Sequence, residues 1–487
     1  MSEVEGMDAL SQEDRPFGQG ISLWGNMPAV DILCLDRNEG RTGSSDRNIA
    51  FVASGDLRNV VRTVNGLSED YTGRTRILMN DHDGFVTIRN VMLFLILGQI
   101  PDKRRAVDIA VHFWYSAFLP ADYEAEIFAI VDGLCASWSG GTVHIRLTET
   151  TKLSCDISPG CYELLKMCRD SVYTCDHAAH EIEKIRFAPS RVDYLHKEFY
   201  PLSPSHRLSF FHFRKSGILL PCAAPTERFT SPNRFLFLPS GDWILSDGSN
   251  PLEAWDIPTF TEVGAAHGAR SEDLYGCLYF YLTEELVKFA TRLTRIKLDI
   301  AVHNEDAIQL AASLPPGARF DRVDVSNIMD RSYVGIKPLV HAWGPRLSDS
   351  PHAALLGYFM NWRVFDDEAA APSRNGYKRL LDRLLSENKV PPVREAATVY
   401  MEGPTAVYDN AHAFERYLKC EGMDACLATA GLRRRRTHRM TPHRLNAPLA
   451  GSPHDLPHFA SAEDWYLNAY VGGALWTERF VEIERIH

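Results

Sequence analysis

The stretch of sequence that decides the fold is IAFVASGDLRNVV, residues 49–61. An apolar run, 49–53, meets the tight turn Ser54-Gly55-Asp56, and apolar residues at helical spacing follow. This order predicts a buried strand, a sharp turn and a helix. Glycine permits the sharp turn, and the free amides of the helix's first turn face the space beyond the carboxyl end of the strand. A phosphate, a carboxylate or a nucleoside can bind in such a place.

A second unit of the same kind follows. Residues 75–79 are predicted as a strand, 80–84 (NDHDG) as its exit turn, and 86–97 as a strongly apolar helix. An acidic residue at the end of a second strand suits ribose hydroxyls, which need acceptors, and Asp81 is the candidate for that role. The alternative is that Asp81 is a turn or N-cap residue that satisfies helix amides.

The same alternation returns late in the chain. We expect strands at 296–302 and 320–325, helices at 305–314 and 334–343, and a further strand or buried helix at 353–360. Strand-helix units at both ends of a long insertion are typical of a doubly wound sheet with an elaborated middle. The predicted fold is therefore α/β, with a Rossmann-like, mostly parallel sheet and a long, largely helical insertion.

The insertion begins after Pro101, where amphipathic stretches at 106–118 and 123–138 predict helices, while 208–256 predicts hairpins or loops that could form a lid. A final alternating stretch, 480–486, predicts a strand that adds to the sheet edge. The expected organisation is a flexible N-terminus (1–20), the first half of the sheet (21–100), the insertion (101–290), the second half of the sheet (291–365) and a C-terminal region (366–487).

The predicted functional site is the carboxyl edge of this sheet, where open α/β folds place their ligands. The candidate residues there are Ser54, Gly55, Asp56, Asp81, Asp324 and Asn327. The alternative is that Ser54 and Asp56 only cap the following helix and that Asp324 and Asn327 only shape a turn. The stretch 53–56 has one glycine where a dinucleotide fingerprint has three, and no phosphate-binding P-loop motif occurs, so the identity of the cofactor is left open. The G-x-S-x-G motif of a serine hydrolase is also lacking around Ser54.

Charge excludes a general affinity for polyanions, because 52 basic residues stand against 63 acidic ones and give a net charge of −11. The tract 433–444 is locally different: it contains several arginines and no acidic residue, a density that can engage phosphates. The candidate nucleic-acid contacts are Arg433, Arg434, Arg435, Arg436 and Arg439. A solvated loop is the alternative interpretation.

The composition, 45% hydrophobic and 24% charged, is that of a globular protein. The longest apolar run, 91–100, is too short for a membrane span, and residues 1–14 lack the basic and then apolar order of a signal peptide. We therefore expect a cytoplasmic protein, whose cysteines are reduced thiols. His177 and His180 follow Cys175, but no second half of a metal motif is nearby, and we predict no structural metal.

Three segments carry a resemblance to a known family. They are LWGNMPAVD (23–31), FVASGDLRNV (51–60) and FDRVDVSNI (320–328). They resemble a large fungal family of uncharacterised proteins, whose N-terminal domain also resembles that of the dynein axonemal assembly factors. The resemblance is strong over residues 20–120 and looser over 230–360. It implies a methyltransferase-type nucleotide-binding sheet whose glycine-rich loop is reduced to Ser-Gly-Asp.

The first functional hypothesis comes from fungal biosynthetic proteins of this appearance, which include the arginine-containing cyclodipeptide synthases that join two aminoacyl groups from charged tRNAs. Their signature Asp-x-x-Asn-Glu resembles Asp324-Val325-Ser326-Asn327, with Ile328 in place of the glutamate. The resemblance implies that Ser54 accepts the first aminoacyl group, that a carboxylate takes a proton, and that the arginine tract holds tRNA phosphate, with no cofactor required.

Two further hypotheses belong to other classes. In an S-adenosylmethionine-dependent methyltransferase, Gly55 would allow close approach of the cofactor, Asp56 would lie near its methionine part and Asp81 would accept from ribose hydroxyls. In a non-catalytic assembly or scaffold protein, as the dynein-factor resemblance implies, the sheet would bind no small molecule. None of the three includes DNA or a membrane as a partner, and the oligomeric state is left open.

Overall fold

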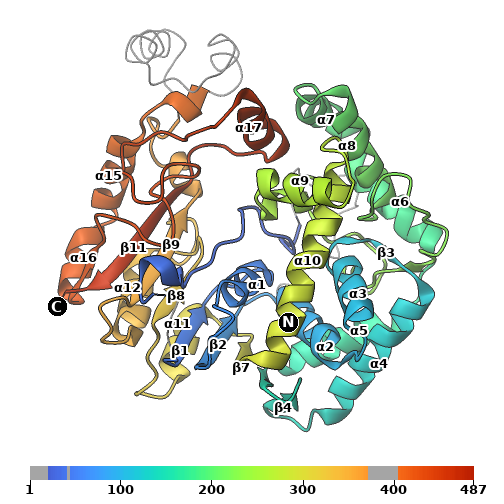
Figure 1. Ribbon diagram of the computed structural model, residues 1–487, viewed down its shortest axis with the longest axis horizontal. Helices are drawn as coiled ribbons and strands as arrows, with labels where there is room; N and C mark the ends of the chain where they lie inside the picture. The colour runs from blue at the N-terminus through green and yellow to red at the C-terminus, as the bar shows by residue number, and fades with distance from the viewer. Residues whose placement is uncertain (1–19, 41–43, 371–403, 487) are drawn as a thin grey trace. The chain divides into compact units, whose positions relative to one another are not determined.

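Strand β1 (Arg47–Phe51) lies inside a nine-stranded sheet and is flanked by parallel neighbours on both sides. The strands follow the order β10-β11-β9-β8-β1-β2-β7-β5-β4, as Figure 1 labels in part. The flanking strands are β2 (Arg74–Asn80) and β8 (Arg322–Asp324), followed outward by β7 (Lys297–His303) and β9 (Ala354–Phe359), all parallel to β1. The predicted α/β class and the mostly parallel sheet are thus confirmed.

The computed structural model describes residues 20–40, 44–370 and 404–486 and divides into two compact units. The sheet unit comprises 29–87, 139–158 and 288–487, and the helical unit comprises 1–28, 88–138 and 159–287. The boundary falls within two helices, α2 (Gly84–Gln99) and α10 (Leu274–Arg295). The prediction of a flexible N-terminus at 1–20 lies almost wholly outside the described residues.

The C-terminal side of the sheet is antiparallel. β11 (Arg479–Arg485) runs opposite to β9 on one side and to β10 (Leu432–Arg434) on the other. The predicted strand at 480–486 is therefore present, but its expected place at the edge is wrong. The edge is β10, which begins the arginine tract and is too short to show alternation in the sequence.

The other side of the sheet contains a hairpin from within the predicted insertion. β4 (Val143–Arg146) pairs antiparallel with β5 (Thr151–Asp156), and β5 pairs parallel with β7. The expected helical and loop insertion over 101–290 did not include this hairpin, whose Leu153 and Cys155 bury one of its faces in the sheet unit.

One large buried cluster of the sheet unit lies on one face of the sheet. Register places Ala50, Leu78, Val323 and Leu355 in one row, and their side chains are in a single buried cluster. The helices that pack on this row are α11 (Ala307–Ser313), α12 (Ile336–Trp343), α15 (Ala411–Cys420) and α16 (Met423–Thr429); Figure 1 shows α12, α15 and α16 beside β9 and β11. Because strand side chains alternate, Asp324 points to the opposite face.

The helical unit is built around buried polar side chains that bind backbone. Arg89 donates to the carbonyls of Phe235 and Trp114, and Asn233 donates to those of Phe113 and Ser116. The remaining elements are α3 (Lys103–Tyr115), α4 (Ala121–Ser137), α5 (Pro159–Asp170), α6 (Cys175–Arg186), α7 (Val192–Phe199), α8 (Pro204–Ser216), α9 (Ile257–Ala266) and the pair β3 (Phe118–Leu119) and β6 (Ser231–Pro232). Residues 208–216, predicted as hairpin or loop, are helical because α8 begins at a Ser203 cap and ends at Gly217 in a left-handed conformation.

No described helix has both the length and the apolar character needed to cross a membrane.

Candidate functional site

The chain leaves β1 at the point where the strand order reverses. β2 follows β1 on one side, whereas β8, from the second half of the chain, lies on the other. Beyond the strand end, the Val52 amide donates to the Asp324 carbonyl (2.8 Å) and the Ser54 amide donates to the Asn80 carbonyl (2.8 Å). Ligands of open α/β sheets bind in the crevice at such a reversal. The predicted residues of this edge do come from adjacent strand ends.

The turn after β1 requires glycine because of its backbone conformation. Gly55 has a φ of 53°, and a Cβ added there would meet only Arg58 Nη1, at 3.9 Å. The space beside Gly55 is therefore open. Ser54 is 8% exposed and donates its hydroxyl to the Gly55 carbonyl (3.2 Å).

Neither Ser54 nor Asp56 is the N-cap of α1 (Arg58–Asn65), because Leu57 occupies that position without a side-chain cap. Asp56 instead accepts from Arg58 through the guanidinium (2.6 Å) and the backbone amide (3.3 Å). Both side chains of this ion pair are less than a tenth exposed. The pair fixes the first turn of α1 and adds a buried cation beside the turn.

Asp81 holds the turn of β1 from the end of β2. Its Oδ2 accepts from the Gly55 amide (3.0 Å) and its Oδ1 from the Asp83 amide (3.0 Å). The cap of α2 is Asp83, whose carboxylate accepts from Phe85 and Val86, so Asp81 is a turn residue and not an N-cap. A carboxylate has further lone pairs, which leaves acceptor capacity on Asp81 for a ligand.

Asn80 is a structural residue of this edge that the sequence analysis missed. It is 2% exposed and donates to the carbonyls of Val52 (2.9 Å) and Glu305 (3.0 Å). Its own Oδ1 accepts from the Glu305 amide (3.0 Å). One side chain thus joins the ends of β1, β2 and β7. The available signal was an amide residue at the last position of a buried strand.

Asp324 ends β8 with a buried carboxyl group. Its Oδ1 accepts from the Ser326 amide (2.8 Å), and its Oδ2 lies 3.4 Å from Asn59 Nδ2. Burial raises the pKa of Asp324 above its ordinary value, against the opposing effects of the Ser326 amide and the Arg58 cation. A carboxyl group with a raised pKa holds a proton more readily than an ordinary aspartate, which suits it to exchanging a proton with a ligand.

The turn after β8 contains a left-handed non-glycine residue. Ser326 has a φ of 54°, its hydroxyl donates to the Tyr358 hydroxyl (3.0 Å), and the Tyr358 amide donates to the Ser326 carbonyl (3.0 Å). Tyr358 comes from β9, so the tyrosine is brought to the edge by the fold alone. Asn327 is half-buried, and its side chain has no hydrogen-bond partner within the described part of the chain.

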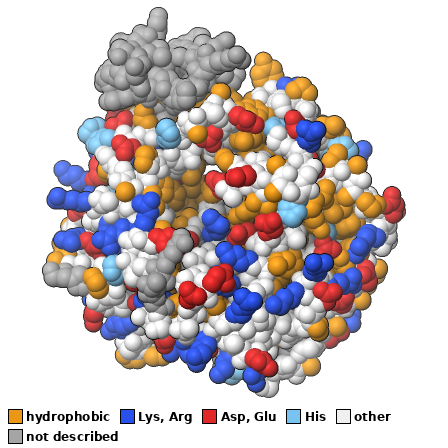
Figure 2. Space-filling view, viewed as in Figure 1, with side chains coloured by type: hydrophobic (Ala, Val, Ile, Leu, Met, Phe, Trp, Pro, Cys, Tyr) orange, Lys and Arg blue, Asp and Glu red, His pale blue; other side chains and the backbone are white. Residues whose placement is uncertain are grey.

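The arginine tract is part of the fold. Arg433 pairs with Glu484, Arg434 with Glu415 and Asp424, and the buried Arg435 with Glu482 and Glu484. Arg439 lies against His352, and Arg436 is exposed. The alternative interpretation of the arginine tract as a solvated loop is wrong for β10, which is a strand of the sheet. Figure 2 shows Lys and Arg side chains interspersed with Asp and Glu over the face in view.

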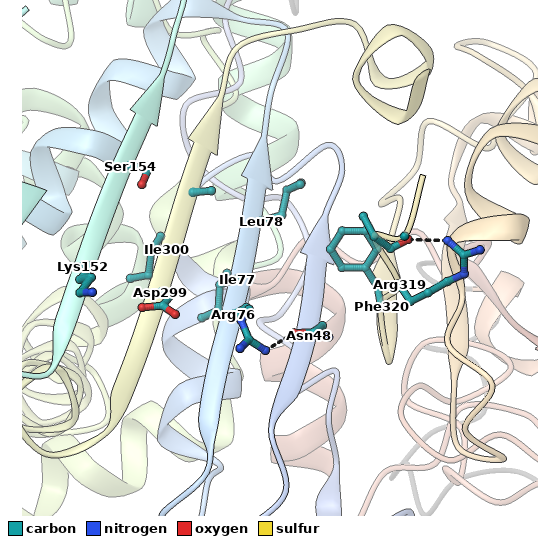
Figure 3. A pocket seen from close by; sticks show the side chains of 13 residues that line it. Asn48, Arg76, Ile77, Leu78, Lys152, Ser154, Asp299, Ile300, Arg319 and Phe320 are labelled. Atoms are coloured by element: carbon teal, nitrogen blue, oxygen red, sulfur yellow. Dashed lines mark hydrogen bonds between the residues drawn. The ribbon is translucent and has the colours of Figure 1, made fainter. Parts of the chain in front are cut away.

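A groove on the sheet unit lies at the opposite, amino-terminal half of the strands (Figure 3). Its volume is about 580 Å³, and its floor is a row in register, Asn48, Arg76, Asp299 and Lys152. None of the predicted site residues lines it. In the described ranges, no group of three or more His, Cys, Asp or Glu side chains is placed to hold a metal ion.

A comparison with family models matches residues 23–119 to a domain of unknown function, DUF4470. The matched region contains the turn after β1 and Asp81, and it excludes Asp324. No curated protein and no solved structure matches the chain.

Proposed function

We propose that the carboxyl edge of the sheet binds S-adenosylmethionine and that the protein is a methyltransferase with a Rossmann-like sheet. The supporting observation is the strand order. Without the β4–β5 hairpin, the sheet strands numbered along the chain follow the order 3-2-1-4-5-7-6, with strand seven antiparallel. Dinucleotide-binding sheets have the order 3-2-1-4-5-6. The antiparallel strand between the fifth and sixth is typical of S-adenosylmethionine-dependent methyltransferases.

The residues of the edge fit this cofactor. The open space beside Gly55 admits a close approach to backbone, and Asp81 keeps acceptor capacity for ribose hydroxyls at the end of the second strand. S-adenosylmethionine, when bound, supplies the methyl group. Nothing in this fit depends on a glycine-rich phosphate loop, since the cofactor has no phosphate to hold.

The second half of the edge would act on the substrate. Asp324, with its raised pKa, can take a proton at Oδ2 from a hydroxyl or amine nucleophile. Asn327 has an amide group to orient that substrate. The buried Asp56–Arg58 pair would position the turn and contact the charged end of the cofactor.

Calorimetric titration with S-adenosylhomocysteine, which needs no substrate, tests the proposal. We expect one site per chain. Gly55→Ala should weaken binding at least about tenfold, because the new Cβ enters the open space. The same variant should cost about 1 kcal/mol of stability, because alanine is strained in the left-handed conformation. The matched control is Gly422→Ala, a left-handed glycine with nothing near its Cβ. It should show the same cost and unchanged binding. Absence of binding, or equal affinities for both variants, contradicts the proposal.

The cyclodipeptide synthase hypothesis stays a prediction. The Ser54 hydroxyl already donates to a carbonyl, and most of the arginines proposed for tRNA contact protein carboxylates. Mass spectrometry of cultures expressing the protein tests it. An arginine-containing cyclic dipeptide that is lost in Ser54→Ala would favour the synthase over the methyltransferase. The scaffold hypothesis predicts neither this product nor S-adenosylhomocysteine binding.

A further inference from the structure

A second cavity of the sheet unit lies among α15, α16, β10 and β11. Its volume is about 630 Å³, within the range of sites that bind small organic molecules. None of the carboxyl-edge residues lines it. Its apolar lining includes Phe414, Leu427, Leu432, Val481 and Ile486.

Arg479 lines this cavity as a buried cation that forms no ion pair with a described carboxylate. It is 1% exposed, its Nε donates to Asn410 Oδ1 (2.9 Å) and its Nη1 donates to the Pro453 carbonyl (2.6 Å). Its Nη2 also donates to Asn410 Oδ1. All of these acceptors are uncharged, and no described carboxylate lies within ion-pair distance of this guanidinium.

A second buried guanidinium, that of Arg444, lies beside Arg479, and the Glu478 and Asp409 carboxylates partly offset its charge. Arg444, which bridges to Arg479 through the backbone, is fully buried and donates to the carbonyls of Trp476, Tyr408 and Thr405. Burial lowers the pKa of Arg479 to about 10 and that of Arg444 to about 9. Buried charges in proteins are normally paired, so Arg479, which lines the cavity, favours an anion beside it.

The carboxylates nearest to Arg479 are already engaged. Glu415 pairs with Arg434 (2.6 Å), and Asp409 pairs with His454 (2.8 Å). Five arginines and two acidic residues line the cavity, and both of the acidic residues, Glu415 and Asp424, contact Arg434. Arg433 and Arg435 pair with Glu484 and Glu482 outside the lining, which leaves Arg436 and Arg479 as the lining arginines with no ion pair among the described residues.

One further cation of the lining, Arg436, suits an anion. Arg436 is exposed, and the rings of His438 and His443 stack at 3.7 Å. His438 Nδ1 lies 3.1 Å from the Thr441 carbonyl, and His443 Nε2 lies 3.0 Å from the Arg436 carbonyl. These contacts fix both rings and hold the loop that carries Arg436 at the mouth.

We propose that this cavity binds a small organic anion with an apolar body, its charged group paired with Arg479 and its body packed on Phe414, Leu427 and Leu432. The inference is independent of the proposed methyltransferase activity. A purely inorganic anion would leave the apolar floor uncovered, and a neutral hydrophobe would leave Arg479 unpaired.

Two fluorescent probes with the same aromatic body test the proposal. 8-Anilinonaphthalene-1-sulfonate carries an anionic group, and N-phenyl-1-naphthylamine does not. We expect the folded protein to bind the sulfonate at one saturable site, at least about tenfold more tightly than the amine. Arg479→Gln should remove this preference. Lys419→Gln, which removes an exposed charge from α15 outside the cavity, should keep it.

A blocking variant covers the case in which Arg479→Gln does not fold. Ala428 lies on the exposed surface of α16 and lines the cavity, so Ala428→Trp should fill the space without disturbing the core. We expect it to abolish sulfonate binding while the thermal unfolding midpoint is unchanged. Equal affinity for the two probes, no saturable site, or full binding by Ala428→Trp would overturn the proposal.

Discussion

The two ends of the sheet use the same residue types in opposite ways. At the carboxyl end, Asn80, Asp81 and Asp324 are buried and accept from or donate to backbone groups. At the amino end, Asn48 and Arg76 lie on an open face of the groove and contact each other (Figure 3). Burying polar groups is costly unless their partners are in place. A cluster of buried polar side chains at a reversal of strand order is therefore the stronger indication of function.

The largest contrast is expected between two ion pairs. Arg58→Gln leaves the buried Asp56 carboxylate without its cation and should cost about 3–5 kcal/mol in the free energy of unfolding. Arg76→Gln removes an exposed pair with Asp46 and should cost under about 0.5 kcal/mol. Urea unfolding of both variants measures the difference. Equal costs would show that burial at the carboxyl end has no special energetic role.

A smaller contrast is expected between two asparagines on neighbouring strands. Asn80→Ala leaves the Val52 and Glu305 backbone groups unsatisfied and should cost about 2–3 kcal/mol. Asn48→Ala removes only a contact with Arg76 and should cost under about 0.5 kcal/mol. The same unfolding measurement applies, and a cost above about 1 kcal/mol for Asn48→Ala would mean that the amino end is also an organised network.

The smallest effects concern pH. Burial raises the pKa of Asp324, so the folded state loses stability as pH rises above the ordinary pKa of an aspartate, about 4. Asp324→Asn should therefore be more stable relative to the wild type above that pH. The pKa of Asp46 is lowered by the Arg74 amide, so its contribution is present at neutral pH and lost as pH falls. Asp46→Asn should therefore be less stable relative to the wild type over the same pH range. Unfolding midpoints at several pH values test this, and slopes of the same sign would contradict it.

Local patterns in the sequence predict the parallel part of the sheet well. β1, β2, β7 and β9 are apolar runs bounded by turn residues, and register then brings their ends together. The strands β10 and β4 have only three and four residues, so neither has a distinct pattern. Long-range pairing gives these segments their structure.

The site was predictable only where its residues adjoin strand ends. Ser54, Asp81 and Asp324 follow or end predicted strands, and they do come together. Tyr358 lies inside a strand, and its contact with Ser326 spans 32 residues of chain. The partners of the arginines, such as Glu415 and Glu482, are equally remote. A charge run in the sequence cannot show which carboxylates fold against it.

Hydrogen–deuterium exchange with and without S-adenosylhomocysteine maps where this ligand binds. We expect slower exchange at the strand ends, residues 53–60, 80–84 and 324–328, and no change along the groove at 317–320. Protection of the groove alone, or no protection anywhere at saturating ligand, would contradict it.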